Sequence, residues 1–360
     1  MNKRKVTLAA AAAGVLTGAA GLSLLAMPAG AGQPPSLPTV SPETLVEQVL
    51  TAKPGAFGGT VEVDNKLGLP AIAEIPQLAD GKHSARIWTD GNGKFRLALP
   101  NGQSEQTVVN DGTTLWSWNS ADNEVTKSEG FDKLGSGKPD SAEQKAADPA
   151  SAAKEIIGKT KEFSDITVDG TARVANRAAY ELVLTPKATE KTLVREVRIA
   201  VDSELKMPLR VAVLTNGTAE PAATVGFSEI NAGPQDAKLF QFTPPAGAKV
   251  TTPEAKENEK RQHPMPELGL EQALQGENPQ IFGSGWDTVV GARIPAEAMT
   301  KVPAEAQGLV DRFTKKVSGS WGTGKLFTTK VATILIADDG RVVAGAVPEQ
   351  VLFDTIGQVK

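Results

Sequence analysis

Hydrophobic and polar residues alternate along residues 82–127, as they do in strands that bury one face. Phe95, Leu97 and Leu99 take every second position in one stretch, and Trp116 and Trp118 do so in another. A period of two residues is typical of a half-buried β-strand. The pattern therefore predicts strands with one apolar face and one largely polar face.

Turn sequences separate these strands. DGNG stands at 90–93, NG at 101–102 and NDG at 110–112, and such pairs of Asn, Asp and Gly favour tight hairpin turns. We therefore expect an antiparallel meander of three or four strands. Its concave face would carry two of the chain's five tryptophans, which either line a ligand cavity or belong to the core.

Two short helices are predicted among further strands. Pro42 follows Ser41 and Pro149 follows Asp148, and each pair suits the start of a helix, with a capping side chain before a proline. Apolar residues at helical spacing follow both. Counting the alternating segments up to residue 250 gives eight to eleven antiparallel strands with two helices.

A second, smaller unit is expected towards the C-terminus. Residues 286–290 read as a strand, residues 295–317 as a helix, and residues 331–347 as a hairpin with an Asp-Gly turn. The predicted organisation is then a signal peptide (1–31), a Pro-rich linker (32–43), a main domain (44–250), a charged linker (251–280) and a small α+β domain (281–360).

The N-terminus has the features of a secretory signal. Three basic residues precede an Ala- and Leu-rich run, and a small-residue cleavage site ends at Ala31. We expect an exported protein, extracellular or in the cell envelope; the alternative is an uncleaved segment that anchors the chain in the membrane. The chain has no cysteine, so neither a disulfide nor a lipid-modified cysteine contributes. A net charge of −4 without a Lys/Arg block argues against nucleic acid as a partner.

The chemistry-bearing residues are sparse. His83 and His263 are the two histidines, so a Ser/His/Asp hydrolase would depend on one of them, and the absence of cysteine and of paired histidines argues against zinc. The segment GSWGTGKL at 319–326 is close to a phosphate-binding loop but has Leu326 where the motif needs Ser or Thr. We expect no enzyme activity, no metal and no cofactor, with a hydrolase as the remaining alternative.

Three segments carry a family resemblance: DGTTLWSW at 111–118, the Val201-Asp202-Ser203 turn that leads into MPLRV at 207–211, and FQFTPP at 240–245. In this order they resemble the LolA-type lipoprotein carriers and, more distantly, the sigma-E regulator RseB. The resemblance covers somewhat over half of the chain. It implies an α+β fold, a half-open antiparallel β-barrel covered by helices, with an apolar cavity for acyl chains.

This resemblance and the apolar alternation predict a non-enzymatic binding protein that holds lipid, or the acyl chains of a lipoprotein. The alternative is an RseB-like regulator that binds a membrane anti-sigma factor or another envelope protein. The predicted cavity residues are the apolar residues of the alternating strands: Phe95, Leu97, Trp116, Trp118, Leu182, Leu184, Ile199, Val211 and Phe227.

Overall fold

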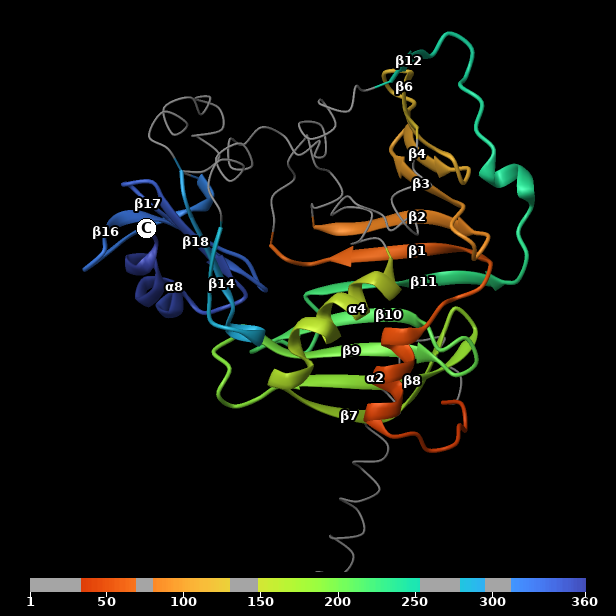
Figure 1. The fold of residues 1–360 in the computed structure, drawn as a ribbon. Helices are drawn as coiled ribbons and strands as arrows, with labels where there is room; N and C mark the ends of the chain where they lie inside the picture. The colour runs from red at the N-terminus through yellow and green to blue at the C-terminus, as the bar shows by residue number, and fades with distance from the viewer. Residues whose placement is uncertain (1–33, 69–79, 130–147, 253–278, 295–311) are drawn as a thin grey trace, which may run out of the picture.

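Two β-sheets with helices packed on them make up the structure (Figure 1). The computed structural model describes residues 34–68, 80–129, 148–252, 279–294 and 312–360. The predicted signal peptide and most of the predicted 251–280 linker lie outside these residues. None of the helices described is both long and apolar enough to cross a bilayer.

The larger sheet has twelve strands in the order β12-β6-β5-β4-β3-β2-β1-β11-β10-β9-β8-β7 and is open, with β12 and β7 at its edges. Strands β1 to β11 pair antiparallel, as predicted, whereas β12 pairs parallel to β6. A mostly-β chain with few helices and an open sheet is thus confirmed. The strands are β1 (Phe57–Asn65), β2 (Gly81–Thr89), β3 (Phe95–Asn101), β4 (Ser104–Asn110), β5 (Thr114–Asn119), β6 (Glu124–Glu129), β7 (Ser164–Val174), β8 (Arg177–Pro186), β9 (Val194–Asp202), β10 (Pro208–Thr215), β11 (Ala223–Ala232) and β12 (Lys249–Thr251).

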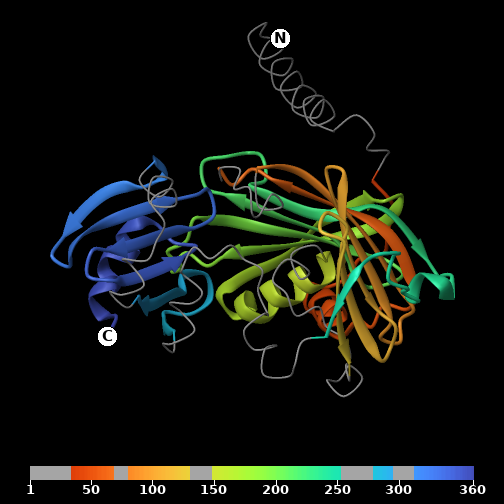
Figure 2. The same cartoon turned by 90° about the horizontal axis from the view of Figure 1, so that it is seen from above.

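Helices α2 (Pro42–Thr51) and α4 (Pro149–Thr160) begin where the sequence predicts. The Ser41 hydroxyl accepts the Thr44 N–H at 3.2 Å, and the Asp148 carboxylate accepts the N–H groups of Ala150 and Ser151. These bonds satisfy amides that have no partner within the helix. A 3-10 turn, η3 (Lys161–Phe163), follows α4. Both helices lie on the same side of the larger sheet (Figure 2).

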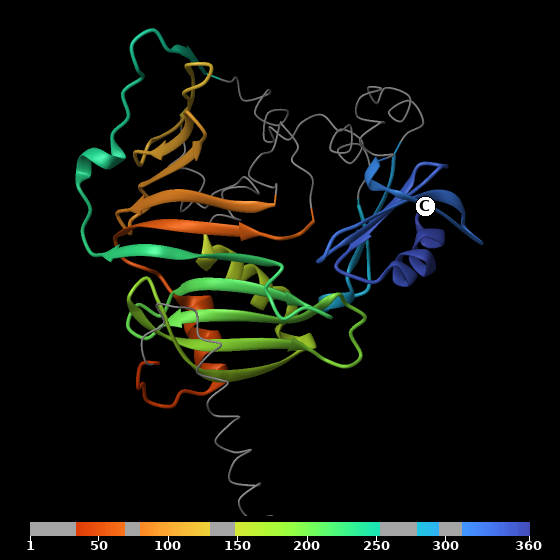
Figure 3. The same ribbon diagram turned by 180° about the vertical axis from the view of Figure 1, so that it is seen from behind.

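The side of the larger sheet that carries α2 and α4 is called the inner face, and the opposite side, seen from behind in Figure 3, the outer face. The main core lies between the helices and the inner face of β7 to β10. Leu45 and Val49 of α2 and Ala153 and Ile157 of α4 are fully buried there. Burying a leucine, valine or isoleucine side chain stabilises the fold by about 1.5–3 kcal/mol relative to exposure.

The smaller sheet has the order β13-β14-β18-β17-β16-β15. Helix α8 and the 3-10 turn η6 pack on one of its faces around Leu335, Val343 and Leu352. The hairpin predicted at 331–347 is confirmed. The elements are β13 (Gln280–Phe282), η5 (Gly285–Asp287), β14 (Val289–Arg293), β15 (Lys315–Gly319), β16 (Gly322–Thr328), β17 (Thr333–Ala337), β18 (Arg341–Gly345), α8 (Glu349–Thr355) and η6 (Ile356–Gln358).

Two predictions for this region are wrong in part. The strand predicted at 286–290 begins only at Val289, because Ser284 and Asp287 close a capping box around η5. Of the helix predicted at 295–317, residues 312–313 are helical and residues 315–317 belong to β15; residues 295–311 lie outside the described residues. Val317 packs on the α8 side of that strand. The GSWGTGKL segment forms the β15–β16 hairpin turn and part of β16.

Trp286 joins the smaller sheet to the larger one. Its side chain is 7% exposed and belongs to the main core, although it comes from η5. The indole N–H donates to the Ser164 hydroxyl at 2.8 Å, and the backbone N–H donates to the Glu190 carboxylate at 3.0 Å. A further bond runs from the Leu193 N–H to the Ala346 carbonyl at 2.9 Å. The two sheets therefore share a core residue and a polar contact set.

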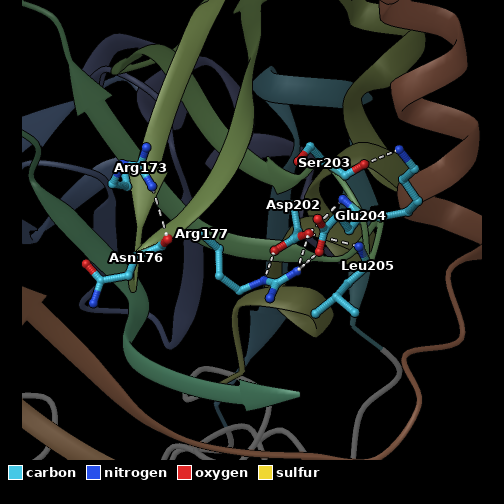
Figure 4. Close-up of polar contacts among 8 residues, drawn as sticks. Arg173, Asn176, Arg177, Asp202, Ser203, Glu204 and Leu205 are labelled. Atoms are coloured by element: carbon cyan, nitrogen blue, oxygen red, sulfur yellow. Dashed lines mark hydrogen bonds and ion pairs between the residues drawn. The ribbon is translucent and has the colours of Figure 1, made fainter. Parts of the chain in front are cut away.

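The turn between β9 and β10 is organised by Asp202, whose side chain is fully buried (Figure 4). Its carboxylate accepts the N–H groups of Glu204 and Leu205, both at 2.8 Å, and pairs with the Arg177 guanidinium. Burial by itself raises the pKa of Asp202, but Arg177 and the two amides outweigh it, so the net pKa lies below its usual value. The Asp202-Ser203 turn noted in the sequence is thus a structural feature.

We expect Asp202→Asn to lower the free energy of unfolding by about 3 kcal/mol, because Arg177 would keep its charge without its buried partner. The matched control is Glu204→Gln, which removes the other, 79% exposed partner of Arg177 and should cost about 1 kcal/mol or less. Urea unfolding at pH 7 measures both changes.

The same pair predicts a pH dependence. Because the folded-state pKa of Asp202 is lowered, its contribution is present above the unfolded carboxyl pKa of about 3.9 and is lost as pH falls through the folded value. The stability difference between the wild type and Asp202→Asn should therefore shrink in urea titrations below about pH 4. A difference that stays constant down to about pH 2 would contradict this role.

Candidate functional site: the inner face of strands β2 to β5

The strand register decides which side chains share the inner face. Val211, in the helix-covered core, pairs with Val225, which pairs with Val63. Val61, two residues before Val63, pairs with Ala85. Side chains on one strand alternate between the two faces of a sheet, so Val61 and Val63 point to the same face. Ala85 therefore continues the inner face from β1 into β2.

Beyond β2 the inner face is built of cross-strand rows. One row runs from Ile87 through Leu97 and Val108 to Ser117 and Thr126. The neighbouring row runs through Phe95, Asn110, Leu115 and Ser128. Apolar side chains dominate the rows on β2 to β4, and hydroxyl side chains take their place on β5 and β6.

These rows contain a separate apolar cluster, called here the apolar patch: Ala85, Ile87, Phe95, Leu97, Leu99, Val108 and Leu115. Three of its members are buried, whereas Ile87, Phe95, Leu99 and Leu115 remain half-buried. Helix α4 packs mainly on β10, and α2 packs on α4 and β7. Within the described ranges, no helix lies over the patch (Figure 1).

Seven of the nine predicted cavity residues lie on the inner face, in three groups. Leu182, Leu184, Ile199 and Val211 are closed under the helices as part of the main core. Phe227 belongs to a neighbouring cluster and packs edge-on against Phe57, with ring centroids 5.8 Å apart. Phe95 and Leu97 belong to the apolar patch.

Trp116 and Trp118 are the exception, because they lie on the outer face. Leu115 and Ser117 are the inner residues of β5, since they pair with Asn110 and Val108. The tryptophans of the same strand must therefore point the other way. The prediction that they share the concave face with Phe95 and Leu97 is wrong. The sequence showed the alternation within each strand but not the register between strands.

Trp116 packs under a segment that crosses the outer face, called here the strap (residues 233–251). The ring of Phe242 lies 5.6 Å from that of Trp116, between centroids, and Phe240 of the 3-10 turn η4 (Ala237–Phe240) is buried. The Trp116 indole N–H donates to Asp111 at 3.0 Å. Two motifs of the family resemblance, 111–118 and 240–245, thus meet in one structural contact.

The predicted cavity residues omit five of the seven patch residues: Ala85, Ile87, Leu99, Val108 and Leu115. A signal was available in the β3–β4 turn, where Asn101 pairs with Ser104 across two residues. Counting back from that pair places Leu97 opposite Val108 and Leu99 opposite Gln106. The turn type determines which residues of β3 and β4 pair, and the Asn-Gly pair alone does not show which turn type is formed.

A second concave feature lies where β1 begins. It is a cavity of about 320 Å³ lined by residues 54–57, Leu205, Met207 and residues 232–234. Ligand pockets for small molecules range from about 300 to 1,000 Å³, so this one is at the lower limit.

Known proteins resemble this chain in structure but not in sequence. The chain matches no family model and no curated protein at the sequence level. Similar solved structures include the MucA/MucB complex of Pseudomonas aeruginosa, with a TM-score of 0.43 and 18% identity over 88% of this chain and 96% of that chain. An uncharacterized conserved protein of Thermus thermophilus has a TM-score of 0.34 and 13% identity over 59% of this chain and 98% of its own.

A LolA superfamily protein of Nitrosomonas europaea is also similar, with a TM-score of 0.24 and 11% identity over 57% of this chain and 99% of its own. The LolA-like and RseB-like resemblance inferred from the sequence thus recurs among solved structures. At these scores and identities, the matches bear on no residue role and no ligand of this chain.

We expect Phe242→Ala to lower the free energy of unfolding by about 2 kcal/mol, because the Trp116 ring loses its aromatic partner and buried contact area. The control is Phe313→Ala, since Phe313 is an exposed phenylalanine at 39%. Urea unfolding monitored by tryptophan fluorescence measures both. Faster proteolytic cleavage within 233–251 should accompany the first change, and equal stability loss in both variants would contradict the strap contact.

Proposed function

We propose that this protein is an exported, non-enzymatic binding protein that holds acyl chains on the inner face of its larger sheet. The observation that carries the proposal is the apolar patch on β2 to β5, which lies beside the helix-covered core yet has no helix over it among the described residues. The LolA-like order of motifs supports the same class of ligand.

The energetics suit an acyl chain. Burying a methylene group contributes about 0.8 kcal/mol, so a long acyl chain that buries ten or more of them gains about 8 kcal/mol or more, which is of the order of the roughly 4–15 kcal/mol that association costs. The patch has seven apolar side chains on four adjacent strands, which form a continuous surface for an acyl chain. Polar contacts with the protein are then needed only at the head group of the acyl chain.

A second candidate function is regulation through an envelope protein partner. It is favoured by Ile281 and Val290, which are cross-strand neighbours on β13 and β14 and are 70% and 43% exposed. They lie on the face of the smaller sheet opposite α8. Two exposed apolar residues side by side fit a protein contact better than plain solvent exposure.

The acyl-binding proposal predicts that Phe95→Ser and Leu115→Ser each weaken uptake of a pyrene-labelled hexadecanoyl ester about tenfold, since each removes roughly 1.4 kcal/mol or more of apolar contact. Both positions are half-buried, so the variants should stay folded. Uptake is measured by pyrene fluorescence, and native mass spectrometry with lipid extraction identifies the natural cargo.

The matched controls change the outer side of the sheet, at Trp118 of β5 and at Phe242 of the strap. Trp118→Ala and Phe242→Ala should keep full ester uptake, with folding checked by circular dichroism. Lost uptake in the outer-face variants with retained uptake in the inner-face ones would overturn the proposed site. A wild-type protein that takes up no ester and carries no lipid would overturn the function.

The regulatory candidate predicts a protein contact at Ile281. A photo-crosslinking amino acid in place of Ile281 should give, in the producing cell, a covalent adduct with one membrane protein. The same amino acid in place of the exposed Gln350 on α8 should give none. Adducts from neither position, or equal adducts from both, would count against a specific partner at this face.

A further inference from the structure

Within the described residues, the inner-face rows of β2 to β6 hold no lysine or arginine, and we infer from this that the ligand of the apolar patch is an acyl chain with an uncharged head, such as a neutral ester, and not a free fatty acid. The inference rests on the proposed function and specifies its ligand. It follows from how the register divides charged residues between the two faces of β2 to β6.

Lysine and arginine are absent from the described inner-face rows of β2 to β6. The positions that complete these rows hold Gln106, Ser117, Thr126 and Ser128, all neutral and polar. The one histidine in these rows, His83 of β2, pairs with Val63 at the other end of the patch. A ligand head at the β5–β6 margin would therefore meet hydroxyl and amide groups.

The single carboxylate in these rows works against an anionic head. Glu124 pairs with Asn119 at the end of β6, where it is exposed and forms an ion pair with Lys249 at 2.7 Å. That pair lies at the sheet edge formed with β12. A fatty-acid carboxylate at this margin would meet Lys249, which is already paired, and would be repelled by the negative charge of Glu124.

The positive charges of these strands lie on the outer face. Arg86 pairs with Ala98 and forms an ion pair with Glu105 at 3.0 Å, and Lys127 lies over the Trp116 ring at 5.5 Å. Arg96, between Trp88 and Val109, shares that face. The hydrogen-bonded sheet separates these cations from the apolar patch, so they cannot neutralise a charge bound there.

The physical consequence is selectivity. A carboxylate moved from water to a neutral apolar surface loses hydration and gains no cation in exchange, which disfavours the ionised form. An ester or hydroxyl head loses less hydration and can hydrogen-bond with Ser117, Thr126 or Gln106. At the same chain length, the neutral lipid should therefore bind more tightly.

The test compares hexadecanoic acid with methyl hexadecanoate as competitors of a neutral pyrene-labelled ester at a mildly alkaline pH, below the concentration at which either aggregates. We expect the methyl ester to displace the probe at a concentration at least about tenfold lower than the acid, since the ionised carboxylate loses hydration on binding. The ester is also the more apolar molecule, which by itself favours its binding. The ratio of the displacing concentrations of acid and ester, called here the acid-to-ester ratio, is therefore compared between the wild type and Ser117→Arg.

Ser117→Arg places a cation on the inner face and should shift the acid-to-ester ratio at least about tenfold towards the acid, because the carboxylate gains a paired charge. The control Gln103→Arg adds the same charge in the exposed β3–β4 turn and should leave the ratio unchanged. Both variants are checked for folding by circular dichroism; if Ser117→Arg fails to fold, Thr126→Lys takes its place on the same row.

The outcomes separate this inference from the function it rests on. A wild type that binds the acid as tightly as the ester, or an inner-face cation that leaves the ratio unchanged, overturns the neutral-head inference while acyl binding stands. A wild type that binds neither competitor nor the probe overturns the proposed function itself.

Discussion

The pairing of β1 with β11 is the contact on which the rest of the larger sheet depends. It joins a meander formed by residues 81–129 to a second one formed by residues 164–232, so that twelve strands share one hydrogen-bonded ladder. Phe57 and Phe227 pack across this pair, and Gly59 leaves room for it, because a Cβ there would come within 2.4 Å of the Glu229 carbonyl oxygen. Without this pairing, the inner face would be two unrelated apolar surfaces.

The two halves of the sheet are covered on opposite sides. Helices α2 and α4 cover the inner face of β7 to β10, where Leu182, Leu184 and Ile199 are fully buried. The strap covers the outer face of the other half, where Phe242 meets Trp116. Within the described residues this leaves the inner face of β2 to β5 as the apolar surface without a helical layer, which is why the proposed site lies there.

Charge follows the same division. The register sends Arg86, Arg96 and Lys127 to the outer face and leaves no lysine or arginine in the described inner-face rows of β2 to β6. The polar network around Asp202 and Arg177 stabilises the turn between β9 and β10. Polar interactions in the larger sheet thus support the fold, while the proposed ligand contact is apolar with a neutral polar margin.

The sequence by itself determined the local features. Alternation and turn residues predicted the strands, and Ser41-Pro42 and Asp148-Pro149 marked the helix starts, because these signals act over a few neighbouring residues. Only the tertiary structure decided which strand faces meet. Moving a strand's register by one residue exchanges its faces without changing its pattern, so Trp116 and Trp118 could not be assigned to a face from alternation alone. The sequence also did not reveal the inner-face positions of Val108 and Leu115, the parallel β12 strand or the place of Trp286 in the main core. All of these depend on contacts between segments that are distant in the sequence.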